Sequence, residues 1–362
     1  MLAATKVDLK PGRLLIDGNW IAGSKHFDTI NPATGEVLTR VAEASPADVD
    51  RAVDAARRAF EDRNGPWRKL SASERGRLLW KLADLIEKNI DELAELETLD
   101  NGKPIFESRY VDMPMVIDVL RYYAGLATKI HGETVNTFET AFTYTLREPV
   151  GVVGLIVPWN FPMPILSWGM APALAAGCTV VAKPAEMTPL TAMRIGSLAL
   201  EAGLPEGVFQ VLPGKGSVVG QRLVDHPAVR KIVFTGSTEV GQSIMTGCAR
   251  QIKRLTLELG GKSANIIFAD ADLERAAATA PYAVFDNAGQ DCCARSRILV
   301  QASVLDRFMG LFETAVSGVA VGDPASAATE MGPLISAAHR AHVASFVPSD
   351  APVAFRGRAP SG

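Results

Sequence analysis

Residues 149–186 read PVGVVGLIVPWNFPMPILSWGMAPALAAGCTVVAKPAE, and this stretch decides the fold. Apolar runs at 152–157 and 178–182 enclose a segment long enough for a helix, and each run ends in a polar loop. Four prolines interrupt the uncharged part, at 158, 162, 164 and 172. Interior prolines each cost a helix about 3 kcal/mol, so a membrane span is excluded. The stretch is predicted to run strand, loop, helix, strand inside the protein.

The same rhythm continues to residue 260, with apolar runs at 207–212, 231–236 and 254–259. Helical stretches separate most of these runs, which is typical of repeated βαβ units. The predicted fold class is therefore α/β with a doubly wound parallel sheet. A second set of apolar runs, ANIIFA and SRILVQ, starts at residue 264 and is predicted to belong to another α/β domain.

The residues before this sheet predict helices and one projecting arm. Ser45-Pro46 and the Ser71/Glu74 spacing are helix-start signals, and 101–104 (NGKP) is a stop signal. Residues 131–147 alternate apolar and polar positions but are too polar for a core hairpin. They are predicted to form a two-stranded arm, either at an oligomer contact or simply on the surface.

Composition narrows the class of protein. The 362 residues are 48% hydrophobic and 21% charged with a net charge of −3, and no long basic run occurs. Nucleic acid is therefore excluded as a partner. The start MLAATKVDLKPGRLL lacks the apolar core of a signal peptide, and four unevenly spaced cysteines do not form a disulfide framework. Both features predict a cytoplasmic protein.

Polar loops follow four of the predicted strands, at the sheet edge where α/β proteins bind ligands. In KPAE, Lys183 and Glu186 form either a rim salt bridge or a pair that holds ribose hydroxyls, which favours NAD over NADP. In GSTEVG, Gly236 and Ser237 begin a helix, where Ser237 is either a plain helix cap or a phosphate ligand.

Two further loops carry groups suited to catalysis. Glu258 ends an apolar strand before two glycines, which suits a general base, although a buried acid satisfied by backbone donors is the alternative. Cys292 and Cys293 follow the polar loop NAGQD. They lack the ligand spacing of a metal site, and adjacent cysteines do not form an unstrained disulfide. The remaining alternatives are a buried filler and a nucleophile. For a nucleophile, Lys183 or a nicotinamide ring would supply the positive potential that favours the thiolate.

Taken together, the loops resemble the aldehyde dehydrogenase superfamily. The matching motifs are PWNFP (158–162), KPAEMTP (183–189), FTGSTEVG (234–241), LELGGKS (257–263) and NAGQDCCA (287–294). The resemblance covers roughly residues 10 to 347. It implies an NAD-binding domain at 1–130 and 148–257, an oligomerisation arm at 131–147, a catalytic domain at 258–362, and assembly as a homodimer or homotetramer.

The resemblance also implies a role for each residue of the site. Cys292 attacks a small aldehyde, the Asn160 amide and the Cys292 N–H hold the oxyanion, hydride passes to NAD, and Glu258 activates water to release the acid. No metal takes part. The cofactor residues implied are Ile156, Trp159, Lys183, Glu186, Gly214, Gly236, Ser237, Gly241 and Leu259. The substrate pocket implied contains Phe161, Asp291 and Cys293.

Asp291 is implied to face the substrate tunnel, where an acid favours cationic substrates such as amino-aldehydes or betaine aldehyde. Bonding of Asp291 to local backbone is the alternative.

The resemblance further implies segments that this sequence does not contain. These are a Glu-x-Phe-Gly-Pro loop that reaches the nicotinamide ribose, a Phe-Gly-Gly segment and a last strand of the oligomerisation sheet. About half of the catalytic domain is therefore expected to be absent, and the polar tail from about residue 348 is expected to be disordered. Two hypotheses follow. The chain is an NAD-dependent, non-acylating aldehyde dehydrogenase, or it is a catalytically inactive NAD-binding or structural member of that family.

Overall fold

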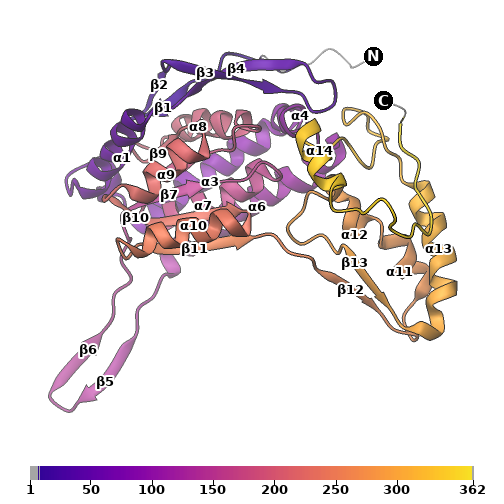
Figure 1. Cartoon of the computed structure of the whole chain (residues 1–362). Coiled ribbons are helices and arrows are strands. Elements are labelled where there is room, and N and C mark those ends of the chain that lie inside the picture. Colours follow the sequence, from indigo (N-terminus) through magenta and orange to yellow (C-terminus); the bar gives the residue numbers. More distant parts are fainter. Residues whose placement is uncertain (1–6, 8, 361–362) are drawn as a thin grey trace.

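A seven-stranded sheet forms the centre of the molecule in the computed structural model, which describes residues 7 and 9–360. Its order is β11-β10-β7-β8-β9-β1-β2 (Figure 1). The strands from β11 to β9 are parallel, and they are β7 (Val152–Ile156), β8 (Thr179–Lys183), β9 (Phe209–Val211), β10 (Val229–Gly236) and β11 (Arg254–Leu259). Every residue of β7, β8 and β9 is buried, as expected of strands covered on both faces. The five predicted strands are confirmed.

The strand order places a switch point between β7 and β10. The chain adds β8 and β9 on one side of β7, then crosses to add β10 and β11 on the other side. At such a point the loops leaving two neighbouring strands diverge and open a crevice for ligands. Here the diverging loops are those that follow residues 156 and 236.

Two antiparallel strands at the edge of the sheet were not predicted. They are β1 (Leu14–Ile16), which pairs with β9, and β2 (Asn19–Ile21), which pairs with β1. Asp17 and Gly18 join them with positive φ values of 52° and 73°. The Asp-Gly pair is a hairpin signal, and it makes the sheet mixed rather than purely parallel. A second antiparallel pair, β3 (Lys25–Ile30) and β4 (Val37–Glu43), lies nearby.

Helices cover both faces of the sheet (Figure 1). One face carries α3 (Ala72–Lys88), α4 (Ile90–Asn101), α6 (Met113–Leu126), α7 (Pro162–Ala175) and α8 (Leu190–Ala202). The other face carries α1 (Pro46–Glu61), α9 (Gln221–Asp225) and α10 (Thr238–Ala249). Two short helices, α2 (Pro66–Lys69) and α5 (Ile105–Glu107), connect longer ones. Ser45 and Ser71 both form capping boxes, so the two predicted helix starts are confirmed.

Helix α7 forms the middle of the uncharged stretch at residues 149–182. Eleven of its residues are buried, and Pro172 lies inside it. Among the described residues, no helix is both long and apolar enough to cross a membrane. The predicted order of strand, loop, helix and strand is confirmed.

A two-stranded hairpin projects from the body of the molecule (Figure 1). It consists of β5 (Thr134–Phe138) and β6 (Ala141–Tyr144), paired antiparallel. Phe138 and Phe142 are 73% and 80% exposed, so the hairpin carries large apolar side chains in solvent. The prediction of an arm is confirmed, and its part in assembly stays a prediction.

Residues after β11 form a separate, smaller unit with its own core (Figure 1). Its parallel strands are β12 (Ala264–Ile267) and β13 (Arg297–Val300). Its helices are α11 (Leu273–Thr279), α12 (Tyr282–Phe285), α13 (Leu305–Gly318) and α14 (Ala337–Ala344). Residues 348–360 contain no helix or strand, although Phe355 contacts Phe312 of α13 edge-on. Disorder of this tail stays a prediction.

Candidate active site

The loop before the two cysteines has an unusual backbone. Asn287, Ala288 and Gly289 have φ values of 48°, 58° and 74°, a left-handed run that L-residues seldom adopt. Such a conformation persists only where surrounding contacts hold it in place. The loop is therefore built by its neighbours rather than by its own propensity.

Hydrogen bonds from distant parts of the chain hold this loop. Both carboxylate oxygens of Glu107 accept from the Asn287 N–H at 3.1 Å, and the Asn287 side-chain amide donates to the Asn160 carbonyl at 2.8 Å. The Gln290 amide donates to the Asn287 carbonyl at 3.0 Å, and its oxygen accepts from the Ile335 N–H at 2.9 Å. Asn287 and Gln290 are both buried. The loop is thus held by three distant residues, Glu107, Asn160 and Ile335, and by one bond of its own.

Asn160 lies beside the cysteine loop, as predicted. Its Nδ2 donates to the Gln290 carbonyl at 2.8 Å, two residues before Cys292. An amide nitrogen has two hydrogens, so this bond leaves a second N–H for another acceptor. Behind Asn160, the Asn101 amide donates to the Trp159 carbonyl at 2.7 Å. Residues 101–104, interpreted from the sequence only as a helix stop, therefore also support the PWNFP loop.

The two cysteines differ in surroundings. Cys292 is half-buried, whereas Cys293 is exposed and its Sγ lies 3.2 Å from a carboxylate oxygen of Asp291. Burial and the negative charge of Asp291 raise the pKa of Cys292. The hydrogen bond that the Cys293 thiol donates to Asp291 raises the pKa of Cys293 to about 11. Cys292 is neither exposed nor a fully buried filler, which fits a group that must meet a substrate.

Two expectations concern the charges near Cys292. The Lys183 ammonium group pairs with Glu186, and its part in favouring a Cys292 thiolate stays a prediction. Asp291 bonds locally, since its Oδ1 accepts from the Cys293 N–H at 3.2 Å. Asp291 therefore bonds to local backbone, as the alternative had it, and its charge also lies beside Cys292. A metal-free site stays a prediction, because Asp291, Cys292 and Cys293 bring three ligand-type atoms within 4.8 Å of one another.

Glu258 lies on β11 near its end, but it is exposed rather than surrounded by apolar side chains. The strand alternates along this stretch, which turns Glu258 out of the sheet core. Two residues after the strand, a Cβ on Gly261 would lie 3.3 Å from the Cys292 carbonyl oxygen. This close approach at Gly261 brings the end of β11 against the cysteine loop.

Lys183 and Glu186 lie together at the end of β8. The Lys183 side chain is 4% exposed, its Nζ is 3.1 Å from Glu186 Oε2, and burial lowers its pKa. Glu186 Oε1 also accepts from the Gly216 N–H at 2.8 Å. Gly214, in the same loop, has a φ of +148°. A Cβ added to Gly214 would lie 3.2 Å from the Ala44 backbone nitrogen. These contacts bring the KPAE and LPGKG loops into one polar cluster.

The start of α10 forms the second wall of the switch-point crevice. Ser237 is its N-cap and accepts from the Val240 N–H at 3.3 Å, so the helix-cap interpretation is present. Gly236 ends β10, and an added Cβ there would lie 2.5 Å from the Phe234 ring. Gly241 lets the helix pack on Leu259, where an added Cβ would lie 2.8 Å away.

Ile156 and Trp159 lie on the β7 side of the crevice. Ile156 ends β7 and is buried. The ring of Trp159 contacts the ring of His339 edge-on, with 5.0 Å between centroids. Helix α14 therefore touches the loop that was predicted to line the cofactor.

A cavity of about 450 Å³ adjoins the cysteine loop and contains two of the predicted pocket residues, Phe161 and Asp291. Cys293 does not line it. Five acids do, and three of them, Glu107, Asp112 and Glu330, come from segments far from the cysteine loop in sequence. The lining acids are Glu107, Asp112, Asp286, Asp291 and Glu330.

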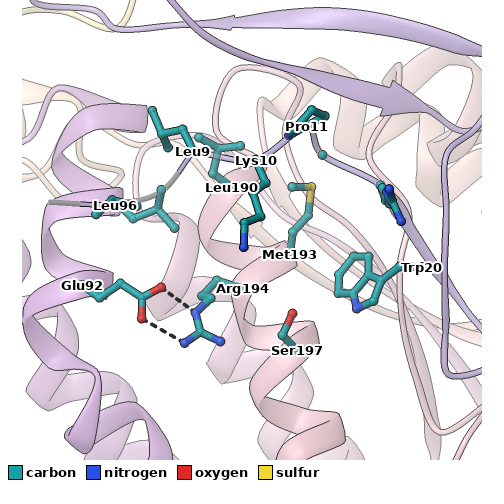
Figure 2. Close-up of a pocket in the computed structure, with 13 residues that line it drawn as sticks. Leu9, Lys10, Pro11, Trp20, Glu92, Leu96, Leu190, Met193, Arg194 and Ser197 are labelled. Carbon is teal, nitrogen blue, oxygen red and sulfur yellow. Dashed lines mark hydrogen bonds and ion pairs between the residues drawn. The ribbon is translucent and has the colours of Figure 1, made fainter. Parts of the chain in front are cut away.

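A larger cavity lies elsewhere. It has about 910 Å³ and lies between the N-terminal segment and helices α4 and α8, where Glu92 and Arg194 form a two-point ion pair (Figure 2). None of the predicted site residues lines this cavity.

Comparison with known proteins supports the arrangement of these loops. Residues 20–351 match the model of the aldehyde dehydrogenase family. A mitochondrial aldehyde dehydrogenase of Mesocricetus auratus is 50% identical over 326 residues, which is 89% of this chain and 65% of that protein. Retinal dehydrogenase 2 of Homo sapiens is 48% identical over 332 residues, 91% of this chain and 64% of that protein. The chain thus spans slightly less than two thirds of these relatives.

A solved structure of an aldehyde dehydrogenase also resembles this chain. Aldehyde dehydrogenase from Bacillus cereus, in complex with NAD+, superposes with a TM-score of 0.91 at 45% identity and covers 93% of this chain and 69% of that one. The family-model match includes strands β7 to β11 and the cysteine loop. This chain belongs to the aldehyde dehydrogenase family.

Proposed function

We propose that this chain oxidises an aldehyde to a carboxylic acid with NAD, through a covalent intermediate on Cys292. The overall reaction is RCHO + NAD+ + H2O giving RCOO−, NADH and two protons. The observation that carries the proposal is the fixing of the cysteine loop against Asn160, whose Nδ2 bonds the Gln290 carbonyl at 2.8 Å. A half-buried thiol is thereby held next to an amide donor.

In the first step the Cys292 thiolate adds to the aldehyde carbon and forms a thiohemiacetal. The second N–H of Asn160 donates to the oxyanion; one such donor contributes roughly 3–4 kcal/mol to an acyl-transfer transition state. Loss of hydride leaves a thioester on Cys292. Glu258 then takes a proton from water, which attacks the thioester and releases the acid.

The switch-point crevice fits a dinucleotide. Glu186 and Lys183 place a carboxylate and an ammonium group where ribose hydroxyls need partners, and the start of α10 at Ser237 offers N–H groups to a pyrophosphate. Gly214 lets the loop backbone approach closely. When bound there, NAD supplies the acceptor for the hydride. The Bacillus cereus relative was solved with NAD+, which supports the same cofactor for this chain.

We further infer a cytoplasmic homo-oligomer, a dimer or a tetramer. All four cysteines are free thiols, which suits a reducing compartment. The exposed aromatic side chains of the β5–β6 arm suit a contact with a second copy of the chain.

The test is NADH formation by the purified chain with propanal or benzaldehyde, using Cys292→Ala beside Cys293→Ala as a matched pair. We expect turnover in the wild type and in Cys293→Ala, and none in Cys292→Ala. Absence of turnover with every aldehyde, or loss only in Cys293→Ala, would contradict the proposal.

A second variant separates the two half-reactions. Glu258→Gln is expected to release about one NADH per enzyme and then stop, because the thioester is not hydrolysed. Quenched-flow measurement of the burst, with mass detection of the acyl group on Cys292, checks this expectation. Steady turnover at the wild-type rate in Glu258→Gln would remove Glu258 from the mechanism.

A further inference from the structure

The cavity beside the cysteine loop is lined by residues that neighbour the reacting groups in sequence. Asp291 directly precedes Cys292, Phe161 directly follows Asn160, and both line the cavity of about 450 Å³. A molecule in this cavity therefore contacts the residue before Cys292 and the residue after Asn160. That volume lies within the range of small-molecule sites.

The lining carries a strong excess of negative charge. Five acids line the cavity, and no Lys, Arg or His among the described residues does. The ammonium group of Lys103 lies behind the wall, where it pairs with Asp112 and sits 3.7 Å from the centroid of the Phe161 ring. Arg295 acts on Asp286 from outside the lining. Lys103 thus offsets Asp112, so the charge that faces the cavity comes chiefly from Asp286, Asp291 and Glu330, and Glu330 also accepts from the Tyr282 hydroxyl at 2.9 Å.

The titration of the acids reflects this crowding. Burial raises the pKa of Glu107 to about 7, and Lys103 opposes the shift only in part. Burial and then the charge of Asp291 raise the pKa of Asp286. Burial is the first cause of both shifts and repulsion between the acids adds to it, so a cation that enters between them favours their ionised form.

Two more features of the lining point to a cationic occupant. Asp112 is 1% exposed, and its Oδ1 has no hydrogen-bond partner within the described part of the chain. The apolar part of the wall is aromatic, with Phe106 and Tyr282 beside Phe161. Aromatic faces together with carboxylates attract ammonium groups, and quaternary ones especially.

We propose that this cavity holds the positive end of the substrate, so that the aldehyde oxidised by this chain carries an ammonium group close to its carbonyl carbon. The inference rests on the proposed function and deepens it. A positive charge in the cavity also offsets Asp291, which otherwise opposes ionisation of the Cys292 thiol. Cationic substrates would thus promote attack as well as bind.

The kinetic test compares two aldehydes of the same shape. Betaine aldehyde carries a trimethylammonium group where 3,3-dimethylbutanal carries a tert-butyl group. We expect kcat/KM to favour betaine aldehyde by roughly tenfold at low ionic strength, and less at high ionic strength. An equal or reversed preference would overturn the inference while leaving aldehyde oxidation in place.

Variants tie the preference to the cavity. Asp286→Asn combined with Glu330→Gln is expected to bring the ratio of the two kcat/KM values close to one. Asp306→Asn with Glu313→Gln, two exposed acids on α13, removes the same charge away from the cavity and is expected to keep the ratio. Equal effects of the two pairs would mean that overall charge, not this cavity, selects the substrate.

A binding measurement keeps the inference testable if no aldehyde is oxidised. Saturation-transfer NMR compares choline with 3,3-dimethylbutanol, its neutral isostere. Choline-selective binding that the Asp286→Asn/Glu330→Gln variant loses would support the cavity assignment even where the proposed oxidation fails. Equal signals from both alcohols would overturn it.

Discussion

Asp291 places a negative charge directly beside Cys292, and this charge makes the Cys292 thiol harder to ionise. It contributes, after burial, to the raised pKa of Cys292. Replacing Asp291 with Asn in a Cys293→Ala background is therefore expected to shift iodoacetamide alkylation of Cys292 to lower pH. Cys178 and Cys248 are buried, so the reaction reports mainly on Cys292. Asp306→Asn serves as the control, and an unmoved alkylation profile in Asp291→Asn would contradict the assignment.

Glu107 and Glu97 make the free energy of unfolding fall as the pH rises from about 4.5 to 7. Burial raises the pKa of each to about 7 from a reference of 4.5. A carboxyl whose folded pKa is raised stabilises the fold below its unfolded pKa, and this contribution is lost as the pH rises to the folded value.

The free energy of unfolding is therefore expected to fall between about pH 4.5 and 7, by about 3 kcal/mol for Glu107. Urea unfolding at several pH values measures this slope. Glu107→Gln should flatten it, Glu313→Gln should not, and a wild-type slope in Glu107→Gln would rule out this role.

At the scale of an element, the start of α10 combines a cap and a predicted phosphate site. Ser237→Ala removes the side-chain acceptor of the Val240 N–H and is expected to cost about 1 kcal/mol of stability. The same change at Ser71, the N-cap of α3, should cost a similar amount. Only Ser237→Ala is expected to weaken NAD binding, which calorimetry measures. Equal NAD affinity in both variants would leave Ser237 as a cap alone.

Strands with two buried faces were predictable because their sequence is apolar throughout, as in β7 and β8. The β1–β2 hairpin was not predicted, since three-residue strands such as Leu14–Ile16 are too short to show a period. In the site, Lys183 and Glu186 were predictable from one loop. Glu107 was not, because it meets Asn287 only through the fold, 180 residues along the chain. Sequence motifs thus identify local chemistry better than the contacts that position it.

At the scale of the whole molecule, the arm is the feature best placed to control assembly. Phe138→Ser with Phe142→Ser is expected to lower the sedimenting mass while leaving the unfolding temperature of the dilute protein nearly unchanged. The reason is that both rings are exposed and contribute little to the core. Tyr122→Ser, at an exposed position on α6, is the control. An unchanged mass in the arm variant would remove the arm from the interface.

The hydrogen bond from the Ile335 N–H to Gln290 also has a consequence for the order of events during synthesis. The sheet that carries Asn160, Lys183 and Ser237 is complete once the ribosome has added residue 259. The cysteine loop obtains its last partner only after residue 335 has emerged. Because chains begin to fold from the N-terminus as they are made, the crevice for the dinucleotide forms before the loop that carries the thiol is held in place. On the proposed function, we therefore expect a nascent chain to bind the dinucleotide before Cys292 is able to react.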